Sequence, residues 1–235
     1  MGKLRALRQT VREALAAEPW PSGLANLETH PPKSLVGPLY AFLLDPDPVL
    51  AARAATAFGR TAARLFDQRP EDARQLMRQL MWRLNEESGN IAWGIPETFG
   101  EILAAQPDLA REFHRVLASY LIESDRKTGD TYIDHAPLRR GVYAGLAILA
   151  KARPELAMAG LEGLLRGLAE EDAPSRAWAA LALGRLLPDA GQDAPRITQA
   201  LDSAARDAAS VSLVWGGTLR ETTVGQVARE CLKNP

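Results

Sequence analysis

Cysteine and long apolar runs are almost absent from this sequence of 235 residues. The single cysteine, Cys231, cannot form a disulfide within the chain, and by itself it cannot supply a thiolate zinc site. No run of 18 apolar residues occurs, so we expect no membrane insertion. The N-terminal segment follows an amphipathic helical pattern instead of the unbroken apolar core of a signal peptide. The sequence therefore predicts a soluble, cytoplasmic protein.

An excess of positive charge is also missing, because 28 Lys and Arg residues face 29 Asp and Glu residues. Proteins that bind nucleic-acid phosphates normally carry a basic surplus, so we do not expect nucleic acid as a partner. Phosphate-cradling glycine loops and the common hydrolase and zinc-protease motifs are absent as well. The histidines His30 and His114 fall in different segments and at no metal-ligand spacing. We therefore predict no cofactor and no metal.

What the sequence does contain is a repeat of about forty residues. Five apolar segments with helical spacing share a matched glycine, at separations of 41, 45, 39 and 41 residues: Gly59, Gly100, Gly145, Gly184 and Gly225. This period is typical of HEAT and armadillo arrays. A glycine inside a helix costs about 1 kcal/mol relative to alanine, so its recurrence predicts a compensating close approach between neighbouring helices.

A second set of apolar segments alternates with the glycine segments, and four of its five members have a proline within their first two positions, where a helix tolerates it. These segments are 33–44, 70–84, 107–122, 154–169 and 194–208. The only β-like run, 211–215, is interpreted as a loop or an irregular helix start. The prediction is an all-α fold, a single α-α superhelix over 1–235 with an N-terminal capping helix at about 3–17. Its five helix pairs are expected at roughly 33–66, 70–105, 107–151, 154–188 and 194–232.

Two segments carry a family resemblance. "DPDPVLAARAATAFGRTA" (45–62) and "EEDAPSRAWAALALGRLLP" (170–188) resemble the second helix of HEAT-type repeats, including those first noted in phycobilisome lyases. The resemblance implies an α-superhelix and, usually, protein binding; it does not imply lyase activity. In such repeats an Asp at the turn and an Arg on the next helix commonly form a ladder between neighbouring repeats. That structural role is expected of Arg53 and Arg176.

The turn at 82–97 is the most unusual in the chain and is the first candidate site. Gly94 stands at the register of the ladder arginines, next to an indole. Pro96 and Glu97 are compatible with a simple helix start, since proline suits the first position and an acidic group suits the helix dipole. The candidate binding residues of this turn are Asn85, Glu86, Glu87, Trp93 and Glu97.

Two further segments supply candidate binding residues. The long connection at 124–141 contributes Tyr132, His135, Arg139 and Arg140, and a segment before the last glycine helix contributes Trp215, Arg220 and Glu221. His135 could form an acid–base pair with Asp134 or simply be solvated. Two adjacent arginines cannot both occupy the ladder position, which favours a binding role for Arg139 and Arg140. Trp178, embedded among alanines, is expected to fill the core between repeats.

Together these features predict a non-catalytic scaffold or adaptor that binds a protein or peptide on the face lined by the starts of the second helices. Two alternatives remain open, and catalysis stays undecided. One is a pocket for a small ligand formed by 85–97 and 124–141. The other is an enzyme, because "PETFGEIL" (96–103) is similar to a segment near the active site of HEAT-like alkylpurine DNA glycosylases. Those enzymes hold damaged DNA with tryptophans, an arginine and a catalytic aspartate; Ala92 stands where that aspartate is expected here.

Overall fold

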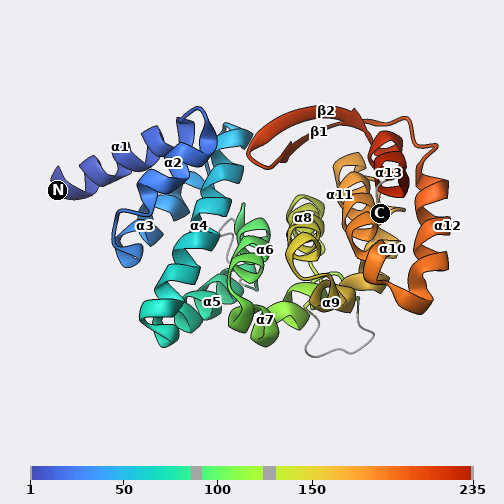
Figure 1. The fold of residues 1–235 in the computed structure, drawn as a ribbon, viewed down its shortest axis with the longest axis horizontal. Coiled ribbons are helices and arrows are strands. Elements are labelled where there is room, and N and C mark those ends of the chain that lie inside the picture. The colour runs from blue at the N-terminus through green and yellow to red at the C-terminus, as the bar shows by residue number, and fades with distance from the viewer. Residues whose placement is uncertain (1, 86–91, 124–130, 234–235) are drawn as a thin grey trace.

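Helices make up almost the whole molecule in the computed structural model, which describes residues 2–85, 92–123 and 131–233. The first half contains α1 (Gly2–Ala16), α2 (Trp20–Leu27), α3 (Pro32–Phe42), α4 (Pro48–Gln68), α5 (Pro70–Leu84), α6 (Ile95–Ala105) and α7 (Pro107–Ser119). The second half contains α8 (Ala136–Ala152), α9 (Pro154–Ala157), α10 (Leu161–Gly167), α11 (Ala173–Leu186), α12 (Ala194–Ala204) and α13 (Val224–Lys233). The all-α prediction is confirmed (Figure 1). Within the described residues, no helix is long and apolar enough to cross a membrane.

The helix starts follow local sequence rules. Asp47 accepts a hydrogen bond from the backbone N–H of Val49 at 2.8 Å and caps α4, and Asp172 accepts one from the N–H of Ser175 at 2.9 Å and caps α11. A proline in the first turn follows each of these caps, where its missing N–H leaves no helical bond unmade. These signals fix the starts of α4 and α11. Helices α3, α5, α7, α9 and α12 begin at, or one residue before, the predicted positions 33, 70, 107, 154 and 194.

The second helices of successive repeats pack side by side in the order α4, α6, α8, α11 and α13 (Figure 1). The glycines lie at their closest contacts. A Cβ on Gly59 would lie 2.7 Å from the backbone of Glu101, a Cβ on Gly145 would lie 2.6 Å from the carbonyl of Pro96, and a Cβ on Gly100 would collide with the backbone of Gly145. The predicted close approach of helices is therefore confirmed for these repeats, and it explains why each glycine is kept despite its helix-propensity cost.

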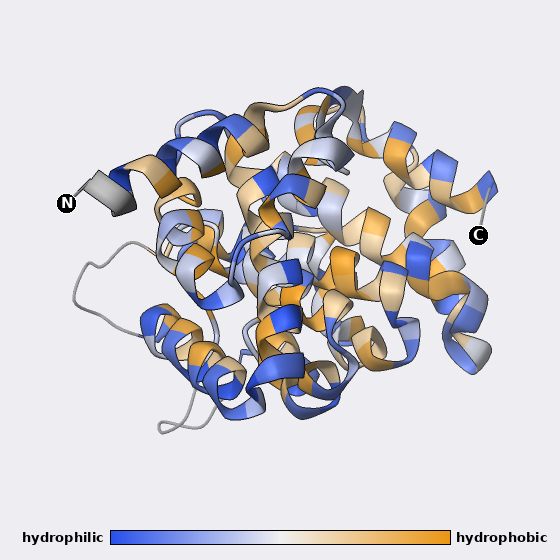
Figure 2. Ribbon diagram, turned by 60° about the vertical axis from the view of Figure 1, so that its left-hand side comes forward, coloured by the Kyte–Doolittle hydropathy of each residue, from blue (hydrophilic) through white to orange (hydrophobic). Residues whose placement is uncertain are grey.

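The first helices of the repeats form an outer layer that packs against one side of the second helices (Figure 1). They are α3, α5, α7, α9 with α10, and α12. Hydrophobic residues gather along the packed faces in the middle of the molecule (Figure 2). The helix predicted at 154–169 is divided, because a short 3₁₀ turn at Met158–Gly160 separates α9 from α10. At the N-terminus α1 caps the array as predicted, and α2, which was not predicted, follows it.

A β-hairpin stands where a loop or an irregular helix start was predicted at 211–215, so that prediction is wrong. Strand β1 (Ser210–Trp215) pairs antiparallel with β2 (Thr218–Thr223), and helix α13 begins only at Val224. Gly216 and Gly217 have φ of +62° and +75°, which form the tight two-residue turn that suits the twist of a hairpin. Val211 and Leu213 are buried while Ser212 between them is exposed, so the strand obeys a period of two instead of a helical period.

The hairpin links the last repeat to the first. Figure 1 shows it running from α13 over the starts of the second helices to α4 at the opposite end of the array. Strand β1 packs against both α11 and α4. We call the side of α4, α6, α8 and α11 that the hairpin crosses the inner face.

Arg53 on α4 fixes the tip of the hairpin. Its Nε donates to the carbonyl of Gly217 at 3.0 Å, and the rest of its guanidinium donates to the carbonyls of Leu15 (2.9 Å) and Ala17 (3.3 Å) and pairs with Glu18. The side chain is buried and does not contact Asp47, which caps its own helix. Arg53 thus has a structural role, as predicted, but it joins the two ends of the chain instead of forming a ladder with Asp47.

Candidate binding cavity under the hairpin

A cavity of about 330 Å³ lies between the inner face and the hairpin, and it is partly open to solvent. Its walls come from four repeats and from the strand and turn of the hairpin. The lining residues are Leu43, Pro48, Ala51, Ala52, Ala55, Thr56, Gly94, Glu97, Glu101, Arg140, Ala144, Ile148, Pro174, Trp178, Arg185 and Ser212 to Gly217. Most of this surface is apolar, so its few charged groups decide what it can hold.

Glu97, in the first turn of α6, places a carboxylate in this cavity. Its Oε2 is buried and has no hydrogen-bond partner within the described part of the chain. The carboxylate lies directly against Gly141 of α8, where a Cβ would stand 2.6 Å from Oε2. Burial raises the pKa of Glu97, and the opposing effects of its own backbone N–H and of the positive charge of Arg140 are smaller. A buried, unsatisfied acceptor is costly to a fold, which makes this group a candidate for ligand contact.

A second carboxylate, Glu101, follows one helical turn later on α6. It accepts a hydrogen bond from the hydroxyl of Thr56 on α4 at 2.7 Å. Burial raises the pKa of Glu101 too, against the hydrogen bond from Thr56 and the more distant charges of Lys151 and Arg185. Two acidic groups at i and i+4 of one helix therefore face the same cavity.

The two arginines of the cavity are already engaged. Arg140 on α8 makes a two-pronged ion pair with Asp172, in which Nε lies 2.9 Å from Oδ2. Arg185 on α11 donates to the carbonyl of Ala147 at 2.6 Å and stacks at 5.0 Å from the ring centre of Trp215. Burial lowers the pKa of Arg185 to about 10, so it stays positive at neutral pH.

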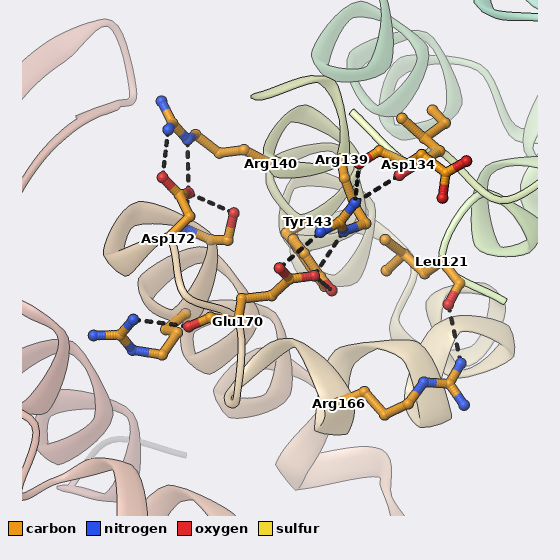
Figure 3. Close-up of polar contacts among 11 residues, drawn as sticks. Leu121, Asp134, Arg139, Arg140, Tyr143, Arg166, Glu170 and Asp172 are labelled. Carbon is orange, nitrogen blue, oxygen red and sulfur yellow. Dashed lines mark hydrogen bonds and ion pairs between the residues drawn. The ribbon is translucent and has the colours of Figure 1, made fainter. Parts of the chain in front are cut away.

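An arginine ladder runs beside the cavity (Figure 3). Arg139 pairs with Glu170 of the next repeat at 2.6 Å and donates to the carbonyls of Ile133 and Asp134. Arg176 does the same one repeat later, with Asp207 at 2.7 Å and the carbonyls of Glu170 and Glu171. The ladder role predicted for Arg176 is therefore correct, although its carboxylate comes from the next repeat instead of Asp172.

Arg139 occupies the same ladder position, and its ion pair lowers the pKa of Glu170. Tyr143 supports the pair by donating its hydroxyl to Glu170 at 3.0 Å. Of the two adjacent arginines, Arg139 is thus held within the ladder, and only Arg140 lines the cavity. Arg139 therefore has a structural role in the ladder, and the binding role predicted for it remains a hypothesis.

The remaining candidates of the first two segments that the structure describes lie outside the cavity. Trp93 is 37% exposed and meets the ring of the exposed His135 edge to face at 5.3 Å. Asn85 is exposed at the end of α5, and Tyr132 lies under the guanidinium of Arg139 at 5.2 Å. Glu86 and Glu87 fall outside the described residues. Ala92, aligned with the glycosylase aspartate, is buried.

The third segment is part of the hairpin. Trp215 lines the cavity, with Arg220 stacked 4.8 Å from its ring centre and Arg185 also against it. Glu221 accepts a hydrogen bond from the hydroxyl of Ser212 on the paired strand at 2.7 Å. These two polar side chains of β2 support the roof of the cavity and do not line it.

Several cavity residues were not predicted from the sequence: Thr56, Glu101 and Arg185, together with Trp178, which was expected only to fill the core. One local signal for Glu101 exists. In "IPETFGEILAA" the two acidic residues are spaced by four on an otherwise apolar helix, so they share one of its faces. Thr56 and Arg185 come from other repeats, and only the packing of α4, α6 and α11 brings them to the same place.

The cavity carboxylate gives a pH prediction. We expect Glu97→Gln to stabilise the protein at neutral pH, because burial raises the pKa of Glu97 above its ordinary value of 4.5. The folded state then holds more protons than the unfolded state. The contribution of Glu97 to the free energy of unfolding is therefore fully present below about pH 4.5. It is lost as the pH rises through the folded pKa, by up to about 1.4 kcal/mol per pH unit.

Thermal unfolding of the parent and of Glu97→Gln between pH 4.5 and 8 measures this effect. The stability difference should grow with pH. Glu155→Gln, the same change at an exposed position of α9, should show no such trend. A difference for Glu97→Gln that stays constant across this range would contradict the expectation.

The repeated helix pairs, the stacked second helices and the arginine ladder define the class: an α-helical repeat protein of HEAT and armadillo type, an α-α superhelix. No model of a protein family matches the sequence. No curated protein is significantly similar to it.

Solved structures of similar shape agree with that class. One engineered protein gives a TM-score of 0.59 at 16% identity, over 99% of this chain and 91% of its own. Another gives 0.58 at 17% identity, over 98% and 89%. A designed armadillo repeat protein, solved in complex with the peptide (KR)4, gives 0.52 at 14% identity, over 97% and 98%. The fold implied by the HEAT resemblance is confirmed, and at these identities the likeness concerns the fold alone.

Proposed function

We propose that this chain is a non-catalytic HEAT-like scaffold that binds a peptide segment of a partner protein on its inner face. The observation that carries the proposal is the cavity, which is lined at the starts of the second helices by Pro48, Gly94, Arg140 and Pro174. Repeat arrays use this surface for extended binding. The designed armadillo neighbour that was solved with a peptide supports the ability of such a fold to hold one.

The size of the cavity limits what it receives. A volume of about 330 Å³ lies at the lower end of the range for ligand pockets, about 300–1,000 Å³. It accommodates one side chain, and the hairpin above it leaves no room for a folded domain at that point. We therefore expect the partner to insert a single side chain and to lay a short stretch of backbone along the rim.

The proposal predicts that filling the cavity abolishes peptide binding. Peptides selected from a phage-displayed random heptapeptide library on the full-length protein are titrated by calorimetry against the parent and against Ala52→Phe. Ala52 is half-buried and faces the cavity, so the phenyl ring should occupy the space of the inserted side chain and weaken binding at least tenfold. Ala51→Phe, at a neighbouring lining position, tests the same space independently.

Arg115→Phe provides the matched control, because Arg115 is exposed on α7, a helix of the opposite side. It should leave affinity within about twofold of the parent, a difference well under 1 kcal/mol. Equal binding by the parent and both cavity variants would overturn the proposal, and so would a selection that yields no binding heptapeptide. Circular dichroism confirms that each variant is folded.

A further inference from the structure

The cavity also indicates the chemistry of its occupant. We propose that the inserted group is a cation, an ammonium or guanidinium at the end of an aliphatic stem, such as a lysine or arginine side chain of the bound peptide. This inference rests on the proposed function and specifies its ligand. It is carried by the charge balance of the cavity, by the unpartnered oxygen of Glu97 and by the apolar walls.

The charges around the cavity do not balance. Glu97, Glu101, Arg140 and Arg185 line the cavity, and Asp172 pairs with Arg140, so three carboxylates accompany two guanidiniums. Lys151, whose charge also acts on Glu101, is exposed to solvent and is not part of the lining. Arg140 is neutralised by its two-pronged pair with Asp172. When both glutamates are ionised, one negative charge remains, and a single positive group from a ligand would complete the set. The cavity is therefore suited to a monocation.

Glu97 offers the contact that such a group needs. Its Oε2 is buried without a hydrogen-bond partner in the described part of the chain, and a buried acceptor left unsatisfied costs about 1–3 kcal/mol. Gly141 leaves the space into which the carboxylate fits, so the group is held in place by the packing of α6 on α8. A guanidinium or an ammonium in the cavity would pair with the carboxylate of Glu97, which lines it, through a charge-assisted hydrogen bond.

The walls fit the stem that would carry the cation. Small and apolar side chains from α4 and α8, Ala52, Ala55, Ala144 and Ile148, line the cavity together with the indole of Trp178. Methylene groups pack favourably on such a surface, while the charged end reaches the carboxylates. An aromatic face beside the path of the stem also attracts a cation.

An anionic occupant fits less well. Both prongs of the guanidinium of Arg140 are occupied by Asp172. Arg185 stacks on Trp215 and donates to the carbonyl of Ala147. An anion would also lie against the carboxylates of Glu97 and Glu101, and like charges in a partly buried site repel strongly. The arrangement thus selects for positive charge.

Three small probes of one length test this directly by calorimetry on the full-length protein: n-butylguanidinium, the uncharged n-butylurea and the anion hexanoate. We expect n-butylguanidinium to bind the parent, and to bind Glu97→Gln at least tenfold more weakly, while neither control probe binds the parent measurably. Because Glu97→Gln is expected to raise stability at neutral pH, lost binding cannot be ascribed to loss of the fold. Affinity for n-butylguanidinium should rise between pH 5 and 8, as Glu97 and Glu101 ionise beside the neighbouring basic groups Arg140, Arg185 and Lys151.

A peptide arm distinguishes a side chain from a free small cation. In a selected heptapeptide each arginine is replaced in turn by citrulline and each lysine by norleucine, which keep the stem and remove the charge. One such replacement should weaken binding to the parent at least tenfold and have little further effect in Glu97→Gln. Binding of the peptide alone would identify the occupant as a side chain of a protein. Binding of n-butylguanidinium with an affinity comparable to that of the peptide would identify it as a small molecule. Either result supports a cation as the occupant.

Two results would overturn the inference. One is equal binding of n-butylurea or hexanoate, and the other is peptide binding that no citrulline or norleucine replacement weakens. If peptides still bind and Ala52→Phe still removes their binding, the proposed scaffold function stands without a preference for cations. If neither peptides nor small probes respond to Ala52→Phe, the proposed function itself has failed.

Discussion

Replacing Arg53 by alanine is expected to lower the free energy of unfolding by about 3–5 kcal/mol, one of the largest effects of a single substitution in this molecule. The buried guanidinium satisfies the carbonyls of Leu15, Ala17 and Gly217. Each buried carbonyl left without a donor costs about 1–3 kcal/mol, and partial entry of water reduces the total. The carboxylate of Glu18 is exposed, so its loss of a partner adds little.

The position of Arg53 gives this variant a second effect. It is the side chain through which α4 holds both the N-terminal segment and the tip of the hairpin, two parts of the chain separated by almost the entire array. In Arg53→Ala, hydrogen exchange of the amides of β1 and β2 should speed up relative to the parent, and by more than that of the amides of α6 and α8. The roof of the cavity would then open more often, and binding of a selected heptapeptide should weaken.

Urea unfolding and hydrogen exchange measure these effects. Arg60→Ala serves as the control, since Arg60 lies on the same helix with an exposed side chain paired to Glu28. It should change stability by less than about 1 kcal/mol. Arg53→Lys keeps the charge and loses the fork of donors, so it should fall between the parent and Arg53→Ala. Equal effects of Arg53→Ala and Arg60→Ala would refute the conclusion that the hydrogen bonds of Arg53 hold the hairpin and the N-terminal segment on α4.

The second large effect is expected of Gly100→Ala, which should destabilise the protein by at least about 2 kcal/mol. A Cβ at this position would collide with the backbone of Gly145 on α8, and backbone cannot turn aside as a flexible side chain can. The helix-propensity gain of about 1 kcal/mol offsets only part of this cost. Because α6 carries Glu97 and α8 carries Gly141, separating the two helices should also weaken ligand binding.

Gly37→Ala is the matched control for this prediction. Gly37 lies inside α3, is exposed, and would place a Cβ in open space. The same chemical change should therefore alter stability by less than about 1 kcal/mol, because the helix-propensity gain is opposed by crowding of the new Cβ against the ring of Pro38. Denaturant unfolding of the two variants compares them directly. Equal destabilisation by both, or no destabilisation by Gly100→Ala, would show that helix contact does not explain the repeated glycines.

The local part of this architecture could be predicted from the sequence, because it depends on spacing alone. The matched glycines predicted the stack of second helices, and the Asp and Pro signals at 47–48 and 172–174 placed two helix starts. The hairpin could also have been found, since two short runs rich in β-branched residues flank Gly216 and Gly217, a strong hairpin signal. It was missed because the glycine repeat was extended to Gly225, which lies in the first turn of α13 and packs against the carbonyls of Ala205 and Asp207.

The candidate site shows the limit of sequence reasoning more sharply. Glu97 and Arg140 were selected for reasons of local pattern, and they do line the cavity. Trp93 and Arg139 were selected by the same reasoning, yet Trp93 meets His135 outside the cavity and Arg139 is held by Glu170. A position near a helix start says that a side chain belongs to one end of the array. It does not say toward which neighbour the side chain turns.

The sequence by itself determined the helical repeat, its period and the close contacts between successive second helices, because periodicity and glycine content act within or between adjacent repeats. Only the tertiary structure decided that the hairpin covers the inner face, since the hydrogen bond from Arg53 to the carbonyl of Gly217 joins residues from opposite ends of the chain. It also decided that Oε2 of Glu97 is buried without a hydrogen-bond partner in the described part of the chain, because the carboxylate fits into the space left by Gly141 on the next repeat. Burial is a property of packing, and packing converts an ordinary helix-start glutamate into the group on which the proposed cation site depends.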